Sequence, residues 1–340
     1  MKLFRVKAYN SLWFGGLRHM SGGEEHYLSS LRLPSIMAFF PFVKKDKKGA
    51  CYGVALCDDS GNIYLPSPAD IVGERKKGGN WRVLKFYNDL DLKGKAFQLP
   101  LIKGTLKAFE SAEGYFITEE GFKEWKEGSI SDKHIKNWSE FAETELKVGL
   151  QINKDTKTAE ESMLYFQERI RLKRGIYISF IAEKLVLNEG FIGGERNPAK
   201  IEKVKNIKLP SCLDNGCNVK KGSYYRLYLL THTYIENNNT EEKPNHTDIE
   251  LKLKPVHGGD EASFKVVWIY SKGSELISGY DKPAVEMLRP GTVILLEAME
   301  DARLQDIVQI CNIPNANGIP KDNFLKSGWN TGILAKGGVE

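Results

Sequence analysis

The sequence predicts an α+β protein made of two successive units. Its 340 residues suffice for two domains of ordinary size, each able to bury its own core. Short stretches with alternating apolar residues recur along the chain, and a few segments show helical spacing instead. The apolar fraction of 41% and the charged fraction of 27% are typical of globular proteins, which excludes a fibrous or disordered chain.

The first unit begins with the order strand, helix, strand, strand. Residues 2–10 alternate imperfectly and predict a first strand, which is followed by a loop rich in glycine and aromatic residues. Pro34 lies near a possible helix start, and Pro41 limits this helix to a short one. Residues 50–66 predict a β-hairpin around the turn sequence DDSG, and two prolines follow its second strand.

The next region, residues 73–147, is charged and loses the strand pattern, and we interpret it as a large insertion. Two helices are predicted within it, one over residues 118–128 and one over residues 131–146. Ser131 followed by Asp132 is a suitable start for the second helix.

A hairpin with a basic strand is predicted to return the chain to the sheet. Residues 148–152 and 170–180 show the alternation of half-buried strands on either side of a polar, turn-like segment. Three basic residues alternate with the apolar set, so a regular strand presents them on one face. They are Arg169, Arg171 and Lys173. A solvated sheet face is the ordinary explanation, and a phosphate-binding surface is the alternative.

The second half contains further strand patterns, a helical pattern and a glycine-rich end. Strands are predicted over residues 224–235, 262–270 and 289–299, a helix over residues 300–311, and the glycine-rich end over residues 327–338. Together they are consistent with a second small α+β unit.

The sequence offers few signs of catalysis, metal binding or membrane insertion. None of the six histidines lies in a recognised catalytic motif, and His19 is the most interesting because it follows Arg18 in a glycine-rich loop. Cys212 and Cys217 lack the partners of a zinc site, and the five cysteines suit reduced thiols in the cytoplasm. No P-loop, dinucleotide motif or membrane-length apolar run is present. We expect no cofactor, no metal and no membrane partner.

The net charge of +5 permits nucleic-acid binding but does not establish it, because such binding depends on whether basic residues cluster on one surface. Basic clusters occur at residues 44–48, 75–77 and 200–208, and Arg196 and Lys336 lie in or near glycine-rich loops. Glycine lets a backbone approach a phosphate closely, and aromatic rings near such clusters suit single-stranded RNA. Solvated charges and ordinary tight turns are the alternative interpretation.

Five motifs, in order, resemble the third-subunit family of the Cmr complex, the type III-B CRISPR effector, within the RAMP superfamily. They are GVALCDDSGNIYLPSPADIV (53–72), VGLQINKDTKTAEESMLYFQERIRLKRG (148–175), FIGGERNPAK (191–200), LRPGTVILLEA (288–298) and SGWNTGILAKGG (327–338). The chain departs from this pattern in two places. Residues 34–43 are bulky and interrupted by proline where the family has small residues, and Trp329 and Asn330 stand in the closing loop where the family has a more compact sequence.

The resemblance implies two ferredoxin-like, RRM-related RAMP units, residues 1–185 and 186–340, with a thumb-like projection in the first unit's insertion. It also implies a non-catalytic subunit of antiviral defence that binds the 5′ handle of the CRISPR RNA (crRNA) and docks the large palm-domain subunit and a backbone RAMP subunit. The candidate RNA-binding residues are Arg18, His19, Lys44, Lys45, Arg75, Lys76, Lys77, Arg169, Arg171, Lys173, Arg196, Lys200 and Lys336. One alternative is a metal-independent, crRNA-processing endoribonuclease that uses His19 or a tyrosine; another is a protein-interaction module without RNA contacts.

Overall fold

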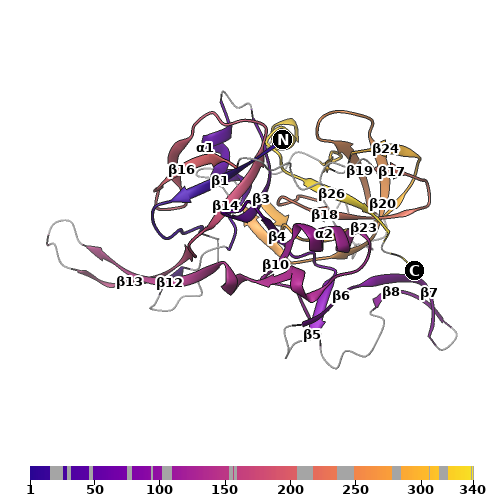
Figure 1. The fold of residues 1–340 in the computed structure, drawn as a ribbon, viewed down its shortest axis with the longest axis horizontal. Helices are drawn as coiled ribbons and strands as arrows, with labels where there is room; N and C mark the ends of the chain where they lie inside the picture. Colours follow the sequence, from indigo (N-terminus) through magenta and orange to yellow (C-terminus); the bar gives the residue numbers. More distant parts are fainter. Residues whose placement is uncertain are drawn as a thin grey trace.

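Two β-rich bodies lie side by side, and a long β-hairpin projects from the first of them (Figure 1). The computed structural model describes residues 1–15, 26–28, 32–45, 49–74, 79–92, 95–101, 109–152, 156, 159–204, 217–235, 249–277, 285–305, 307–313, 321–337 and 339. The prediction of an α+β protein is confirmed, although strands greatly outweigh helices in the described part of the chain.

An antiparallel sheet of eight described strands forms the first body. Its order is β11 (Ile135–Asn137), β10 (Tyr115–Thr118), β4 (Ile63–Pro66), β3 (Cys51–Asp58), β14 (Ile176–Ala182), β1 (Lys2–Ala8), β16 (Asn197–Lys203) and β15 (Glu189–Ile192). β14 is antiparallel to both β1 and β3, which therefore run parallel to each other. β15 and β16 complete this sheet, so its strands extend to Lys203, past residue 185, where we expect the first unit to end.

A short helical segment covers one face of this sheet. It consists of η1 (Ile36–Phe39) and α1 (Phe40–Val43), so the helix is short, as predicted. Pro41 lies in the first turn of α1, where a proline is tolerated. The Phe39 ring stacks on Phe180 of β14 at a centroid distance of 4.5 Å. Phe39 and Phe42 are fully buried, so the bulky residues of this segment fill the core, each contributing about 1.5–3 kcal/mol.

The insertion contains strands that the sequence pattern did not reveal. β5 (Ile71–Glu74), β6 (Gly79–Val83) and β9 (Phe109–Ser111) form a small sheet, and β7 (Lys85–Leu92) pairs with β8 (Lys95–Leu101). The first predicted helix is confirmed as α2 (Glu119–Lys126), where Thr118 accepts a hydrogen bond from the Gly121 amide.

The second predicted helix of the insertion, residues 131–146, is wrong. The segment forms the single turns η2 (Asp132–His134) and η3 (Trp138–Glu140), with β11 between them. Ile135 pairs with Ile117 of β10, so sheet pairing overrides the local helical pattern.

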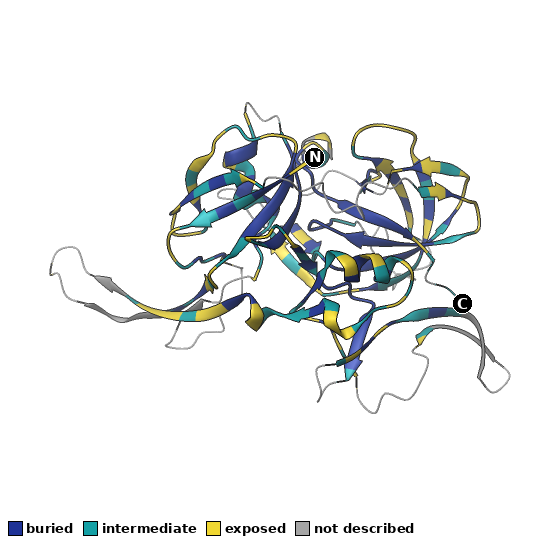
Figure 2. Ribbon diagram, in the orientation of Figure 1, coloured by how far each residue is buried: buried dark blue, intermediate teal, exposed yellow. Residues whose placement is uncertain are grey.

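The predicted hairpin is confirmed in part: its second strand begins at Ala159, inside the segment expected to be turn-like, and ends at Leu172, whereas residues 176–180 belong to β14 of the eight-stranded sheet. β12 (Ala142–Ile152) pairs with β13 (Ala159–Leu172), and β2 (His26–Leu28) runs parallel to β13. Figure 2 shows that the described residues of the projecting hairpin are mostly exposed or intermediate, whereas the strands of both bodies contain the buried residues.

Described strands of the second body close into an antiparallel barrel. Its order is β18 (Tyr224–Leu229), β23 (Val293–Ala298), β20 (Ala262–Tyr270), β19 (Glu250–Pro255), β25 (Ile307–Ile310) and β26 (Thr331–Lys336). Smaller elements are β17 (Cys217–Val219), β24 (Ala302–Leu304), β21 (Ser274–Ile277), β22 (Val285–Leu288) and the helix α3 (Lys321–Leu325).

The helix predicted over residues 300–311 is also wrong, because this segment supplies β24 and β25. Ile307, Val308 and Ile310 are β-branched and buried in a barrel strand, and so short an apolar run has no distinctive period. None of the helices among the described residues is long and apolar enough to span a bilayer.

A buried ion pair joins the two bodies. Arg226 of β18 lies 3.2 Å from the Asp70 carboxylate, and the side chains of both are almost fully buried. The Trp125 indole donates to Asp70 at 2.8 Å, and Arg226 donates to the Trp125 carbonyl at 2.7 Å. The first motif, residues 53–72, which contains Asp70, therefore joins the bodies.

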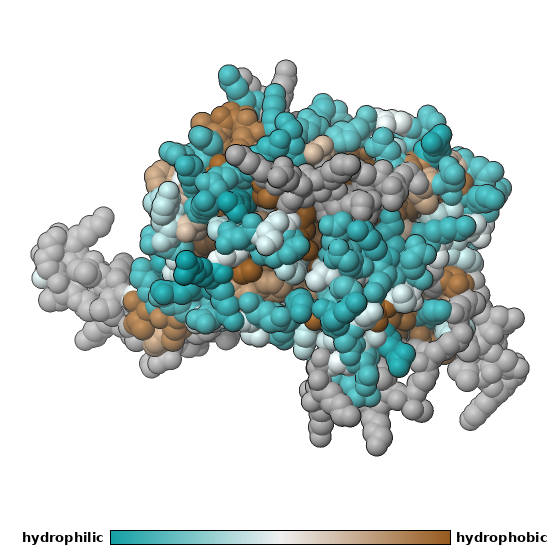
Figure 3. Space-filling view, in the orientation of Figure 1, coloured by the Kyte–Doolittle hydropathy of each residue, from teal (hydrophilic) through white to brown (hydrophobic). Residues whose placement is uncertain are grey.

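The closing glycine loop forms a second joint. Trp329 is only 5% exposed, stacks on Phe324 and meets the edge of Phe40. The Cys51 amide donates to the Ser327 carbonyl at 3.1 Å, and Asn330 is fully buried. Trp329 therefore packs between the bodies, whereas Asn330 bonds to Tyr234 within the second body. In the view of Figure 3 the surface is largely hydrophilic.

Candidate nucleic-acid interface

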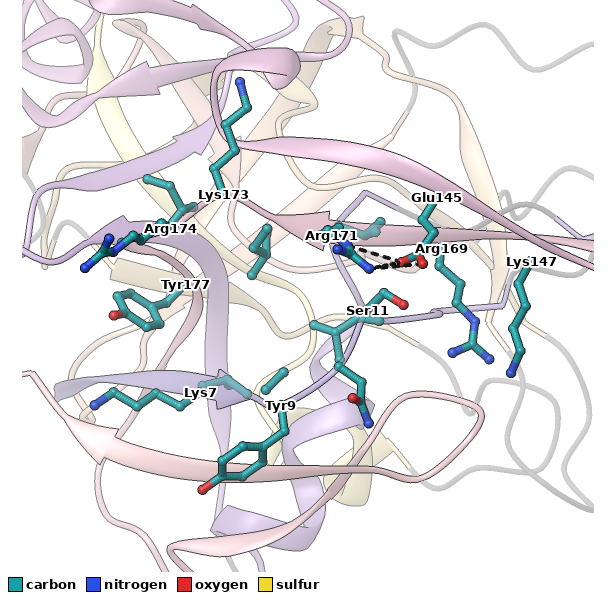
Figure 4. Close-up of a pocket in the computed structure, with 18 residues that line it drawn as sticks. Lys7, Tyr9, Ser11, Glu145, Lys147, Arg169, Arg171, Lys173, Arg174 and Tyr177 are labelled. Carbon is teal, nitrogen blue, oxygen red and sulfur yellow. Dashed lines mark hydrogen bonds and ion pairs between the residues drawn. The ribbon is translucent and has the colours of Figure 1, made fainter.

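A basic groove lies where the projecting hairpin meets the first body. It has a volume of about 950 Å³ and is lined by the end of β1 and the residues after it, by β12 and β13, and by the turn into β14 (Figure 4). The cations that line it are Lys7, Lys147, Arg169, Arg171, Lys173 and Arg174. Among the described lining residues Glu145 is the one carboxylate, so the groove carries an excess of positive charge.

Two backbone hydrogen bonds build this groove. Leu12 and Ile170 each donate an amide to the other's carbonyl, at 2.8 and 2.7 Å, and both side chains are buried. Because Ile170 points into the core, its neighbours Arg169 and Arg171 point together toward the groove, as the alternation predicts. Gly175, at φ +80°, allows the tight turn into β14.

Arg169 is a buried positioning residue. It is 6% exposed, and its Nε donates to the Gln167 side chain at 2.8 Å. Its guanidinium also pairs with Glu195, which lies in the Gly-Gly-Glu-Arg turn between β15 and β16. Two motifs that are separate in sequence therefore meet at this ion pair, and the charge of Arg169 is already matched.

Arg171 is the exposed counterpart. Its side chain is 64% exposed and contacts both carboxylate oxygens of Glu145 at 3.1 Å. Hydrogen bonds from Ser11 and Arg171 lower the pKa of Glu145, so this carboxylate stays ionised near neutral pH. An exposed pair of this kind contributes only about 0–1 kcal/mol, so a phosphate can replace Glu145 at little cost.

Lys173 and Arg174 extend into solvent from the turn between β13 and β14. Lys173 donates to the Ser139 carbonyl at 2.5 Å, and no carboxylate among the described residues pairs with Arg174. Lys147 of β12 lies 3.8 Å from Glu195, a carboxylate that Arg169 also engages. Lys173 and Arg174 are exposed and Lys147 is 53% exposed, so all three are accessible to an anionic ligand.

Sequence reasoning missed Lys7, Lys147 and Arg174. Arg174 directly follows Lys173 in the basic run, so the run itself is a signal that could have identified it. Lys147 and Lys7 join the groove through the pairing of β12 with β13 and of β1 with β14, which no local pattern reveals.

The other predicted residues are dispersed. Lys200 lies opposite Lys7 in the pairing of β16 with β1, and Arg196 follows Glu195 in its turn. The Lys44 ammonium instead lies 3.7 Å above the Phe40 ring and donates to Ser327 at 2.6 Å, so it serves the second joint. The residues placed elsewhere are Lys45, which is exposed after α1, and Lys336, which ends barrel strand β26. Arg18, His19, Arg75, Lys76 and Lys77 lie outside the described residues.

No histidine lines the groove among the residues that the structure describes. His134 contacts Thr118 at 2.8 Å and Glu124 at 3.4 Å, and His232 contacts Glu275 at 2.9 Å, so both have structural partners. Within the described ranges, no cluster of three or more histidine, cysteine or acidic residues is placed to hold a metal ion.

Comparison with known proteins identifies the family. Among solved structures, chains described as type III-B Cmr-beta bound to cognate target RNA, with or without AMPPnP, are 13% and 14% identical to this chain. Each alignment covers 86% of both chains, with TM-scores of 0.46 and 0.47. No curated protein matches. The model of the family described as CRISPR-associated protein (Cas_Cmr3) matches residues 42–333, so the resemblance seen in the sequence is confirmed and the chain belongs to this family.

Proposed function

We propose that the chain is a non-catalytic, RNA-binding subunit of a type III-B CRISPR effector in the cytoplasm. Its basic groove is proposed to bind the 5′ handle of the crRNA. The observation that carries the proposal is a groove lined by Lys147, Arg171, Lys173 and Arg174, with one carboxylate among its described lining residues. Phosphate contacts by lysine and arginine provide most of the affinity of proteins for RNA backbones.

The first body supports the proposed RAMP architecture. β14 lies between β1 and β3 and is antiparallel to both, and the segment η1–α1 connects β1 to β3. This is the split β-α-β arrangement of ferredoxin-like units. We assign the first unit to residues 1–204 and the second to residues 217–339. We move the thumb-like projection from the insertion at residues 73–147 to the β12–β13 hairpin that follows it.

Family membership also suggests the protein partners. We propose that the chain docks the large palm-domain subunit and a backbone RAMP subunit, as the resemblance implies, and that the groove stays open to RNA in that assembly. Two bodies fixed by the Asp70–Arg226 pair and by the closing loop offer such partners a rigid surface.

Binding of labelled crRNA, with and without its 5′ handle, across a salt series tests the proposal. Anisotropy gives the affinity, and a denaturing gel of the same samples shows whether the RNA stays intact. Arg174→Ala and Arg171→Ala should each weaken handle binding and lower the salt slope by about 0.7, the value for one lost contact to a single-stranded phosphate. Arg303→Ala is the control, because Arg303 is an exposed arginine on β24 of the second body.

Two results would contradict the proposal. Equal affinity for RNA with and without the handle would remove the assigned ligand. Shortened RNA products would favour the endoribonuclease instead, and loss of cutting in His19→Ala would then support that activity. Arg169→Ala is a poor test, because it removes a buried guanidinium that pairs with Glu195 and so disturbs the fold.

A further inference from the structure

The sheet of the first body has an open face beside the groove. In antiparallel pairing, residues opposite each other project from the same face. Tyr9, which follows β1, donates its amide to the Pro198 carbonyl on β16, and Pro198 lies opposite Phe191 on β15. Lys7, Lys200 and Glu189 form the neighbouring row in the same way.

Two aromatic rings on this face lack a packing role. Tyr9 is 71% exposed and Phe191 is 57% exposed, whereas Phe4 and Val6 on the opposite face of the sheet are buried. Pro198 between the rings is exposed as well. Apolar rings aligned in one exposed row, beside a row that holds Lys7, Lys200 and Glu189, are typical of a binding surface more than of a solvated sheet. Lys7 also pairs with Glu202 at 2.9 Å.

The face is continuous with the groove. Lys7, Tyr9 and Tyr177 line both, and Figure 4 shows Lys7 between the two tyrosines. The Tyr177 hydroxyl donates to Asp59 at 2.8 Å, and the Arg5 guanidinium lies 4.7 Å from the Tyr177 ring centroid, so one face of this ring is occupied. Tyr9 shows no such ring contact among the described residues.

Phe191 has a cation beside it. The Arg196 guanidinium lies 5.8 Å from the Phe191 ring centroid, which leaves the other ring face for a ligand. Tyr9 and Phe191 are separated by one strand, which corresponds to about 10 Å. This spacing places the rings far enough apart to contact different bases of one strand.

We propose that this face is a stacking platform for unpaired bases of single-stranded RNA that leaves the groove. Tyr9 and Phe191 provide the ring surfaces, and Lys7, Lys200 and Arg196 face the phosphates. The inference rests on the proposed function of the groove, because the RNA strand is taken to run from the groove onto this face. Stacking on aromatic side chains tolerates any base, so the platform lengthens the RNA footprint without reading sequence.

The test compares Tyr9→Ala and Phe191→Ala with Phe109→Ala, which removes a ring that is 59% exposed on β9 in the insertion. The probe is a single-stranded oligoribonucleotide that carries 2-aminopurine along its length, with a perfect RNA duplex as the second ligand. Each platform variant should weaken single-strand binding roughly 5- to 150-fold at an unchanged salt slope. Tyr9→Phe should bind like the wild type, and duplex binding should not change.

Results for the groove and the platform are separable. Weaker binding by Arg174→Ala, with wild-type binding by both ring variants, would overturn the platform and leave the groove standing. Weaker binding by the ring variants, with wild-type binding by Arg174→Ala, would support the platform and overturn the groove. Ring variants that bind RNA normally but no longer bind a protein subunit would also overturn the platform.

Discussion

Replacing Arg226 by methionine tests the joint between the two bodies. The Arg226 guanidinium contacts the Asp70 carboxylate at 3.2 Å and donates to the carbonyls of Trp125 and Lys126. Asp70 retains only the Trp125 indole as a side-chain partner in the variant. Arg226→Met therefore leaves a buried carboxylate without its counter-charge, while methionine fills much of the arginine volume.

The expected loss follows from the burial of the pair. Removing one partner of a buried ion pair costs about 3–5 kcal/mol. An unfolding entropy of about 2.1 cal/mol/K per residue gives about 0.7 kcal/mol/K for 340 residues, so Tm should fall by about 4–7 °C if both bodies unfold together. Arg303→Met, at an exposed arginine, should change Tm by less than about 1 °C.

The pH dependence gives a second signature. Burial raises the pKa of Asp70, and Arg226 and Trp125 oppose that rise. Without Arg226 the pKa rises further, so the folded variant binds a proton that the unfolded chain releases, and its stability falls as pH increases. The deficit against wild type should be larger at pH 8 than at pH 5.

Differential scanning fluorimetry of four proteins checks the reasoning: wild type, Arg226→Met, Asp70→Asn and the double variant. Asparagine keeps an oxygen for the Trp125 indole and removes the buried charge, so the double variant should recover much of the lost Tm. A double variant no more stable than Arg226→Met would refute the account based on an unpaired charge. So would a loss that is the same at pH 5 and pH 8.

Two further predictions concern the packing between the bodies. Gly328→Ala should lower Tm by more than Gly222→Ala. Both glycines have a positive φ, so alanine is strained at either position. At Gly328 the added Cβ would also lie 2.0 Å from the Cys51 carbonyl oxygen, whereas at Gly222 it would meet nothing among the described residues. Equal losses in scanning fluorimetry would show that backbone strain alone matters. Burial lowers the pKa of Lys272 to about 7. Between pH 7 and pH 10 the unfolded chain therefore keeps a proton on Lys272 that the folded protein has lost, so the stability of the folded protein should rise with pH in this range. Urea unfolding midpoints measured across this pH range should rise less in Lys272→Met than in the wild type. Lys254→Met, which changes an exposed lysine, should leave the rise unchanged.

The sequence predicts a strand well where one of its faces is buried and the apolar residues alternate. It fails where the strand pairs with a partner that is distant in sequence. The β12–β13 hairpin follows from apolar alternation, and α1 follows from its prolines. Residues 131–146 and 300–311 have helical spacing over short windows only, and their partners, β10 and the barrel, are distant in sequence. Short apolar runs cannot decide between helix and strand on their own.

The candidate site was predictable in part. Alternation places Arg169 and Arg171 on one face, and the structure brings both to the groove. Their different roles depend on Glu195 and Glu145, which lie in other strands or turns, so no local pattern separates the buried arginine from the exposed one. Tyr9 and Phe191 become neighbours only through β16, which follows both in sequence.

The motifs that carry the family resemblance are largely those that hold the two bodies together. Ser67 and Asp70 of the first motif are fully buried, and Trp329 of the closing loop is buried as well. A side chain buried between two bodies must satisfy both at once, so few residue types fit there, whereas an exposed lysine can move along a groove and still meet a phosphate. Family membership is therefore recognisable from the joints, and the RNA path must be tested on the exposed cations and rings.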